Sequence, residues 1–156
     1  MCRTDCYIGN VEPDLFSRQL RNIGYSFDTE GIEKFVSWFS KLNSECNLEI
    51  QLDRNDDGAM SESLGLSIGF ARRMPADFRN FFAGEQGNAI ISKLSEMSIS
   101  GERIKYIAKS SFSSLLKTSS GFAGMICTPA FIKTVWVRGV PVKSKLYCMF
   151  SVKHFG

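Results

Sequence analysis

Residues 46–70 read CNLEIQLDRNDDGAMSESLGLSIGF, two alternating stretches on either side of a polar loop. In the first stretch Leu48, Ile50 and Leu52 alternate with polar residues. In the second, Leu66 and Ile68 alternate with glycine and serine. Such alternation predicts half-buried strands, because successive side chains of a strand point to opposite faces. Residues 54–58, RNDDG, are typical of a turn, so the whole stretch predicts a β-hairpin with an acidic loop.

The glycines of the second stretch, Gly65 and Gly69, lie on the face opposite Leu66 and Ile68. A glycine inside a strand often marks a place where another group approaches closely. We therefore expect another backbone or a partner against this face.

Two helical patterns precede the hairpin, at residues 14–25 and 28–42. Asp28 is the expected N-cap of the second helix. Apolar residues recur in each at the spacing of one buried stripe: Leu15, Phe16, Leu20 and Ile23 in the first, and Ile32, Phe35, Val36, Phe39 and Leu42 in the second.

Three helical patterns follow the hairpin. One opens at Pro75, breaks at residues 84–88 and resumes over residues 89–97. Another starts at the N-cap candidate Ser100 and is predicted to run to Lys117. Its expected buried side comprises Ile104, Ile107, Ala108, Phe112, Leu115 and Leu116.

The last part of the chain is rich in β-formers, with predicted strands at residues 131–138 and 145–155 joined by residues 139–142. Helices and strands in this order predict one α+β domain over residues 1–156, with residues 1–12 irregular. We expect four to five helices on one side of a mainly antiparallel sheet of four to five strands.

Composition supports a folded protein: 44% of the 156 residues are hydrophobic and 22% are charged. No apolar run approaches the roughly 18 residues that span a bilayer, so membrane insertion is not expected. The first residues lack the apolar core of a secretory signal. The five cysteines are an odd number at irregular spacing, which favours reduced thiols and a cytoplasmic location, although export by a dedicated system is compatible with the sequence.

Residues 103–156 contain no Asp or Glu, yet they carry nine Lys or Arg and eight aromatic residues. The first 102 residues hold all 16 acidic residues together with the other ten basic ones. This asymmetry suggests a functional face in the C-terminal third.

Pairing Arg138 with Lys143 across the predicted turn would place Trp136 opposite Lys145. A one-residue change of register would exchange the two faces. In the chosen register one face is basic and aromatic: Thr134, Trp136, Arg138, Lys143, Lys145, Tyr147, Met149 and Lys153. The other face is the expected core: Val135, Val137, Leu146, Cys148, Phe150 and Val152.

Basic and aromatic side chains are typical of protein interfaces. The predicted partner-binding residues are Trp136, Arg138, Lys143, Lys145, Tyr147 and Lys153, with Lys105 and Lys109 on the preceding helix. An acidic protein surface is the favoured partner. Single-stranded nucleic acid is the alternative, because lysines neutralise phosphates and aromatic rings stack on bases. A solvated face, with its charge offset by the acidic helices, is the third interpretation.

Asp53, Asn55 and Asp57, followed by Gly58, match the opening of a calcium-binding loop. Leu64, however, occupies the position where such a loop needs its bidentate glutamate. A plain hairpin loop is therefore favoured, and no metal or cofactor is predicted. A zinc site would need Cys2, Cys6, Cys148 and His154 to meet, at spacings unlike the usual zinc motifs.

His154 is the single histidine, so any imidazole-dependent chemistry must use it. A metal-independent ribonuclease or toxin-like hydrolase could combine it with Lys153, Lys145 and Tyr147. The chain lacks a glycine-rich phosphate loop, a serine nucleophile elbow and a metalloprotease helix. The sequence therefore favours a small non-enzymatic binding protein, such as an inhibitor, an immunity-type protein or a regulatory accessory factor.

Overall fold

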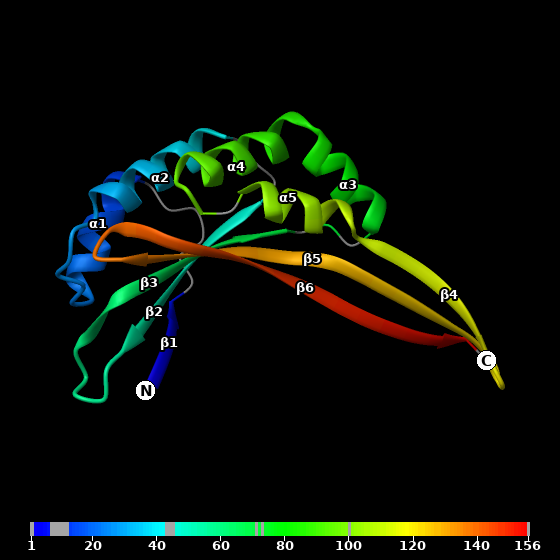
Figure 1. The fold of residues 1–156 in the computed structure, drawn as a ribbon. Coiled ribbons are helices and arrows are strands. Elements are labelled where there is room, and N and C mark those ends of the chain that lie inside the picture. Colours follow the sequence, from blue (N-terminus) through cyan, green and yellow to red (C-terminus); the bar gives the residue numbers. More distant parts are fainter. Residues whose placement is uncertain are drawn as a thin grey trace. The chain divides into compact units, whose positions relative to one another are not determined.

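The computed structural model describes residues 2–6, 13–42, 46–70, 72, 74–99 and 101–155. These residues contain five helices and a six-stranded sheet, mainly antiparallel, so the predicted α+β class is confirmed (Figure 1). In chain order the elements are β1 (Cys2–Cys6), α1 (Pro13–Asn22), α2 (Glu30–Lys41), β2 (Asn47–Arg54), β3 (Met60–Gly69), α3 (Pro75–Ala83), α4 (Glu85–Glu96), α5 (Gly101–Lys109), β4 (Phe112–Thr118), β5 (Gly121–Val137) and β6 (Val140–Phe155).

The strands follow the order β1-β2-β3-β5-β4, and β6 also pairs with β5. The chain forms two compact units. The first unit comprises Met1–Gly69 and Lys133–Lys145, and the second comprises Phe70–Ile132 and Leu146–Gly156. The long strands β5 and β6 therefore each contribute one part to either unit.

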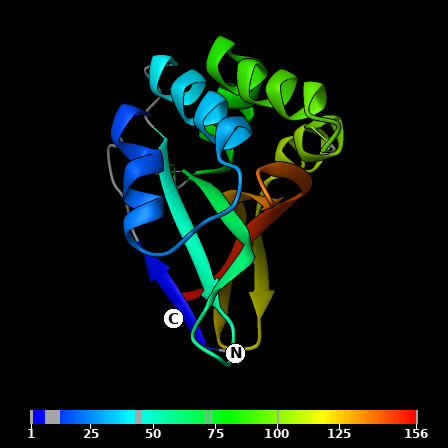
Figure 2. The same cartoon turned by 90° about the vertical axis from the view of Figure 1, so that its left-hand side faces the viewer.

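In the first unit, α1 and α2 pack against each other and lie against the β2–β3 hairpin (Figure 2). The predicted stripe of α2 is buried through Ile32, Phe35, Val36 and Phe39. The prediction of Asp28 as the N-cap is wrong by one residue, although Asp28 Oδ1 accepts a hydrogen bond of 3.0 Å from the backbone N–H of Glu30. The helix itself is preceded by Thr29 as the capping residue.

The β2–β3 hairpin confirms the predicted alternation. Antiparallel pairing places Leu48 opposite Ile68, Ile50 opposite Leu66 and Leu52 opposite Leu64, and all six side chains are buried. The connecting loop is shorter than predicted, because β3 already begins at Met60.

The other face of β3 is covered as well, and there the expected close approach is made by a side chain. Gly65 is buried, and a Cβ atom added to it would overlap the side chain of Lys133 from β5. The Nζ of Lys133 then reaches Gln51 Oε1 on β2, at 2.5 Å. Glycine at position 65 thus gives the lysine stem room to cross the strand.

The predicted turn at residues 139–142 is wrong. The strands meet at a two-residue turn, Arg138-Gly139, whose φ angles are +49° and +78°. Two left-handed residues are the signature of the type I′ turn, whose twist matches that of paired strands. Thr134 and Trp136 are buried and therefore face the core instead of the predicted outer face, because α2 covers this side of β5 through the contact between Phe35 and Trp136. Of the predicted core face, Val135, Val137 and Leu146 are half-buried, and Cys148, Phe150 and Val152 are exposed.

In the second unit, α3, α4 and α5 pack together. Phe70 makes edge contacts with Phe78, Phe81 and Phe82 of α3, at centroid distances of 5.5 to 6.0 Å. Of the predicted break at residues 84–88, only Gly84 interrupts the helices, because α4 already begins at Glu85. Beyond the helices, the backbone N–H of Phe70 donates to Ala130 O on β5 at 3.0 Å, which joins the start of this unit to its sheet.

The predicted helix from Ser100 to Lys117 is wrong in its second half. The helix ends at Lys109, and Phe112–Thr118 forms β4 instead. A regular antiparallel register pairs β4 with residues 121–127 of β5, across a two-residue turn at Ser119 and Ser120. This hairpin pairing outweighs a periodicity that also fitted a helix. Of the predicted buried side, Ile104 is buried, whereas Ile107, Phe112, Leu115 and Leu116 are exposed.

The expectation that residues 1–12 are irregular is wrong for Cys2–Cys6. This segment is β1, and it pairs antiparallel with β2 from Cys2 opposite Arg54 to Cys6 opposite Ile50. Residues 7–12 lie outside the described part of the chain.

Candidate interaction surface

Trp136 lies in the core of the first unit and not on a binding face. Its side chain is 1% exposed, and its ring contacts that of Phe35 at 5.7 Å between centroids. The indole Nε1 donates to Thr134 Oγ1 at 2.9 Å, and that hydroxyl donates to Leu66 O at 3.2 Å. Each buried polar group is thereby satisfied, so the predicted exposure of Trp136 is wrong for a structural reason.

Arg138 marks the turn between β5 and β6. Its Nε lies 2.6 Å from Glu62 Oε2, and its backbone N–H donates to Glu62 O at 3.0 Å. Its charge is thus paired within the first unit. Lys143 and Lys145 follow on the same unit's part of β6, and both are exposed.

The remaining predicted residues lie in the second unit. Lys105 is half-buried and Lys109 exposed on α5, while Lys153 is exposed on β6. Tyr147 stacks on Phe131 with 4.4 Å between centroids and 18° between the rings. One face of Tyr147 is therefore already occupied. The eight predicted residues come equally from the two units, and their role in binding stays a prediction.

The second unit exposes a sheet that we call the distal sheet: β4, residues 121–127 of β5 and residues 148–155 of β6. Figure 1 shows these strands running clear of α3, α4 and α5. Eight large apolar side chains on the distal sheet have exposed fractions between 42% and 63%: Phe112, Leu115, Leu116, Phe122, Met149, Phe150, Val152 and Phe155. Side chains of this size that stay in water forgo the favourable free energy that their burial would provide.

These apolar side chains divide between the two faces of the distal sheet. On one face Phe112 lies opposite Cys127 and Leu116 opposite Ala123. Cys148 of β6 contacts Cys127, so Phe150 and Val152 belong to the same face by alternation. This set is called face one.

Face two carries Leu115 and Lys117 of β4, the latter opposite Phe122. A Cβ atom added to Gly124, which lies opposite Leu115, would come 3.0 Å from the ring of Phe155. Phe155 therefore covers the missing side chain, and Lys153 and Met149 share its face by alternation. Both faces thus present apolar groups to solvent.

The electrostatics of the distal sheet are simple: it contains Lys117, Lys153 and His154 and no acidic residue. With each large apolar side chain about half exposed, the eight together present on the order of 700 Å² of apolar surface. About half of this area lies on each face, so each face alone presents less than the roughly 800 Å² that one partner contributes to a standard protein interface. The distal sheet therefore has the composition of an interface core, apolar and aromatic with few charges.

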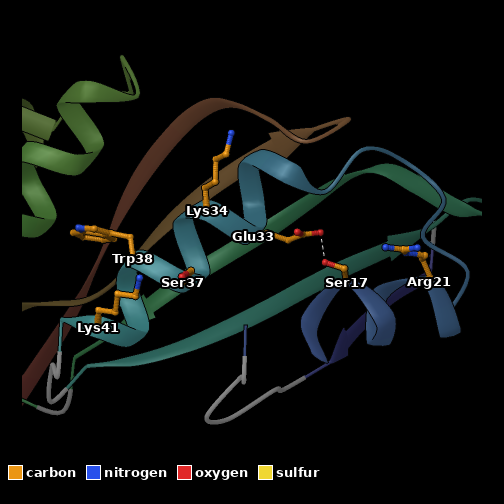
Figure 3. A pocket seen from close by; sticks show the side chains of 7 residues that line it. All are labelled: Ser17, Arg21, Glu33, Lys34, Ser37, Trp38 and Lys41. Atoms are coloured by element: carbon orange, nitrogen blue, oxygen red, sulfur yellow. Dashed lines mark hydrogen bonds between the residues drawn. The ribbon is translucent and has the colours of Figure 1, made fainter. Parts of the chain in front are cut away.

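A second feature is an open hollow of about 700 Å³ between α1 and α2 (Figure 3). It is lined by Ser17, Arg21, Glu33, Lys34, Ser37, Trp38 and Lys41. Glu33 accepts hydrogen bonds from the hydroxyls of Ser17 and Thr29, and Lys34 pairs with Glu30 at 2.5 Å. The hydrogen bond from Ser17 to Glu33 joins α1 to α2.

The hydroxyl of Ser17, followed by that of Thr29, holds the pKa of Glu33 below its ordinary value, and the positive charge of Arg21 adds to the effect. Hydrogen bonds to the charged form favour ionisation. Glu33 is therefore a charged structural anchor near neutral pH, whereas a general base needs a pKa closer to 7.

The loop of the β2–β3 hairpin uses its oxygen atoms in turn hydrogen bonds. Asp57 Oδ1 accepts from the Ala59 N–H at 2.9 Å, and Asn55 O accepts from the Gly58 N–H at 2.9 Å. Leu64 lies buried in β3. Within the described residues, no group of three His, Cys, Asp or Glu side chains is arranged to hold a metal ion.

The distal sheet also contains two neighbouring thiols, those of Cys148 and Cys127. Partial burial raises the pKa of the Cys148 thiol, and the neighbouring Cys127 raises it further. A raised pKa keeps the thiol protonated and a weak nucleophile. His154 is exposed near the end of β6. Cys2 and Cys6, the other members of the predicted zinc set, have no described side-chain positions.

The distal sheet shows which residues the sequence interpretation missed. The sequence predicts Phe112, Leu115 and Leu116 in a helical core and Phe122 in no element. The available signal was SSG at residues 119–121, which fits the end of a helix but is equally typical of a hairpin turn.

None of the helices in the described residues is long and apolar enough to cross a membrane. Comparison of the chain with protein-family models, curated protein sequences and solved structures found no match.

Proposed function

We propose that this protein is a non-enzymatic binding protein and that the distal sheet is its partner surface. The observation that carries the proposal is the exposure of eight large apolar side chains on an acid-free sheet. Monomeric proteins rarely leave such groups together in water unless a partner covers them.

The favoured partner is a protein with an apolar surface and acidic residues around it. Phe, Met and Leu supply the apolar contact, and Lys117 and Lys153 supply the positive charge that acidic groups would complement. Basic residues are few on the distal sheet, so affinity depends mainly on the buried apolar area. This replaces the predicted role of Trp136 by that of Phe122, Met149 and Phe155.

The test is a partner captured from the native cell, purified, and titrated against the wild-type protein and F122S/M149S/F155S. These three side chains lie on face two and are 47% to 54% exposed, so their replacement should leave the fold intact. Aromatic anchors at an interface often contribute more than 1 kcal/mol each, so we expect affinity to fall at least about tenfold. The double variant V140S/V142S is the matched control, because these valines are equally exposed on the first unit's part of β6.

The proposal is wrong if the triple variant, with an unchanged circular dichroism spectrum, binds the purified partner as tightly as the wild type. A titration with a single-stranded oligonucleotide at two salt concentrations separates the nucleic-acid alternative. Binding that falls steeply with salt would indicate phosphate contacts. We expect no such binding from a sheet with two lysines.

A further inference from the structure

β4 is an edge strand without the usual protection against pairing. Among the described strands it pairs with β5 and stands at the end of the sheet order. Proteins commonly protect such edges with proline, a bulge or several charged residues. The sequence FSSLLKT of β4 has no proline and one lysine, and its pairing with β5 runs without a register shift.

The seven residues of β4 also suit a symmetric pairing. In an antiparallel pair of two β4 strands centred on Leu115, that residue lies opposite its own copy. Ser114 then lies opposite Leu116, Ser113 opposite Lys117, and Phe112 opposite Thr118. Directly opposed residues point to the same face of a sheet. Face one of one copy therefore continues into face one of the other, and face two into face two.

We propose that β4 pairs with β4 of a second copy of this chain, about a two-fold axis at Leu115. The inference rests on the proposed function, since it names what occupies one edge of the distal sheet. Main-chain hydrogen bonds along β4 continue the sheet from one copy into the other. Each dimer face then joins the apolar residues of both copies.

Charge does not oppose this occupant. In the symmetric register, each Lys117 faces a serine hydroxyl instead of the other lysine. The two lysines lie four residues apart along the strands, about 14 Å. That separation exceeds the Debye length of about 8 Å at physiological salt, so their repulsion is largely screened.

The size of the contact sets the expected strength. Seven paired residues span about 24 Å of strand. Pairing along one edge alone belongs to the small class of interfaces below about 1,200 Å², which are weak or transient. We therefore expect a dimer that forms reversibly as the protein concentration rises.

The test combines mass measurement with crosslinking. Light scattering on wild-type protein between about 1 and 500 µM brackets a weak equilibrium, and we expect the mean mass to rise toward that of a dimer. L115K should stay monomeric over this range, because it places two like charges directly opposite each other. Leu115 is 63% exposed, so the substitution should not disturb the folded monomer.

Position-specific disulfides test the register. Under mild oxidation, L115C should give a covalent dimer on a non-reducing gel, whereas S113C, at a position facing Lys117, should give no more than the wild type. The double variant S113C/K117C should crosslink again. Wild type and single variants control for the native cysteines.

A wild-type protein that remains monomeric throughout, or a dimer that survives L115K and crosslinks equally at positions 113 and 115, would overturn the inference. The variants that test the proposed function leave β4 unchanged. If the wild type stays monomeric and F122S/M149S/F155S still abolishes partner binding, the dimer is excluded and the proposed binding function stands.

Discussion

The β2–β3 hairpin and the β4–β5 hairpin are both regular antiparallel pairs, yet their environments are opposite. β3 is buried continuously from Leu64 to Ile68, on both of its faces. β4 is exposed from Phe112 to Lys117, also on both faces. Both strands carry large apolar residues, so hydrophobicity alone did not decide which was covered.

The difference comes from neighbours. β3 lies between β2 and β5 in the sheet order, and Lys133 crosses its second face. β4 stands at the end of that order. An apolar strand in the middle of a covered sheet stabilises the fold, whereas one at an uncovered edge is available for association. The comparison therefore predicts separate effects on stability and on binding.

The largest effect is expected from Trp136→Ala. Removing a large aromatic side chain from the core leaves a cavity, so the free energy of unfolding should fall by about 3–5 kcal/mol. Urea denaturation followed by circular dichroism measures the change. Phe122→Ala is the control from the distal sheet, with an expected change within about 0.5 kcal/mol. Equal stability of the two variants would contradict the placement of Trp136 in the core.

The same substitution made in both hairpins sharpens the comparison. Leu66→Ala in β3 should lower the free energy of unfolding by about 2–5 kcal/mol, because Leu66 is fully buried. Leu115→Ala in β4 should change it by less than about 0.5 kcal/mol at concentrations where the protein is monomeric. Thermal and urea melts of the two variants, measured side by side, give the ratio of their losses in unfolding free energy. A similar loss in both would show that β4 is covered within the monomer.

An intermediate effect is expected at the β5–β6 turn. Gly139 has a φ of +78°, and a Cβ atom there would overlap the backbone oxygen of Asp28. Gly139→Ala should therefore destabilise the first unit by more than the roughly 1 kcal/mol that a left-handed alanine costs. Gly58→Ala is the matched control, because Gly58 has a φ of +83° but no atom within 4 Å of the added Cβ. If the two variants lose the same amount of stability, the left-handed backbone alone accounts for the effect, and the close approach of Asp28 to Gly139 contributes nothing.

The smallest effect concerns the anchor between α1 and α2. The folded-state pKa of Glu33 lies below the ordinary 4.5, so its stabilisation is present above that value and is lost as the pH falls through the folded-state pKa. Ser17→Ala removes one of the two hydroxyls, and because the site is partly exposed we expect a loss of a few tenths of a kcal/mol at pH 7. Urea melts from pH 7 to pH 3 should show the difference from wild type shrinking at acid pH. A difference that stays constant with pH would mean that Ser17 acts through packing and not through the carboxylate.

Local periodicity predicted some elements of the fold correctly and one of them wrongly. The stripe of α2 from Ile32 to Phe39 and the alternation from Leu48 to Leu52 come from local periodicity, and both were correct. The segment from Phe112 to Lys117 fitted a helix by periodicity, but its pairing with residues 121–127 made it a strand. The candidate surface shared this error in part, because the sequence predicts Phe112, Leu115 and Leu116 in a helical core.

The sequence by itself determined the α+β class, the positions of the first four helices and the β2–β3 hairpin, and the absence of acidic residues after Glu102. Each depends on residue type and spacing along the chain. Only the tertiary structure decided that Trp136 is core and that Leu115 and Phe122 are exposed. The reason is physical: burial of a strand face depends on which other segments of the chain cover it.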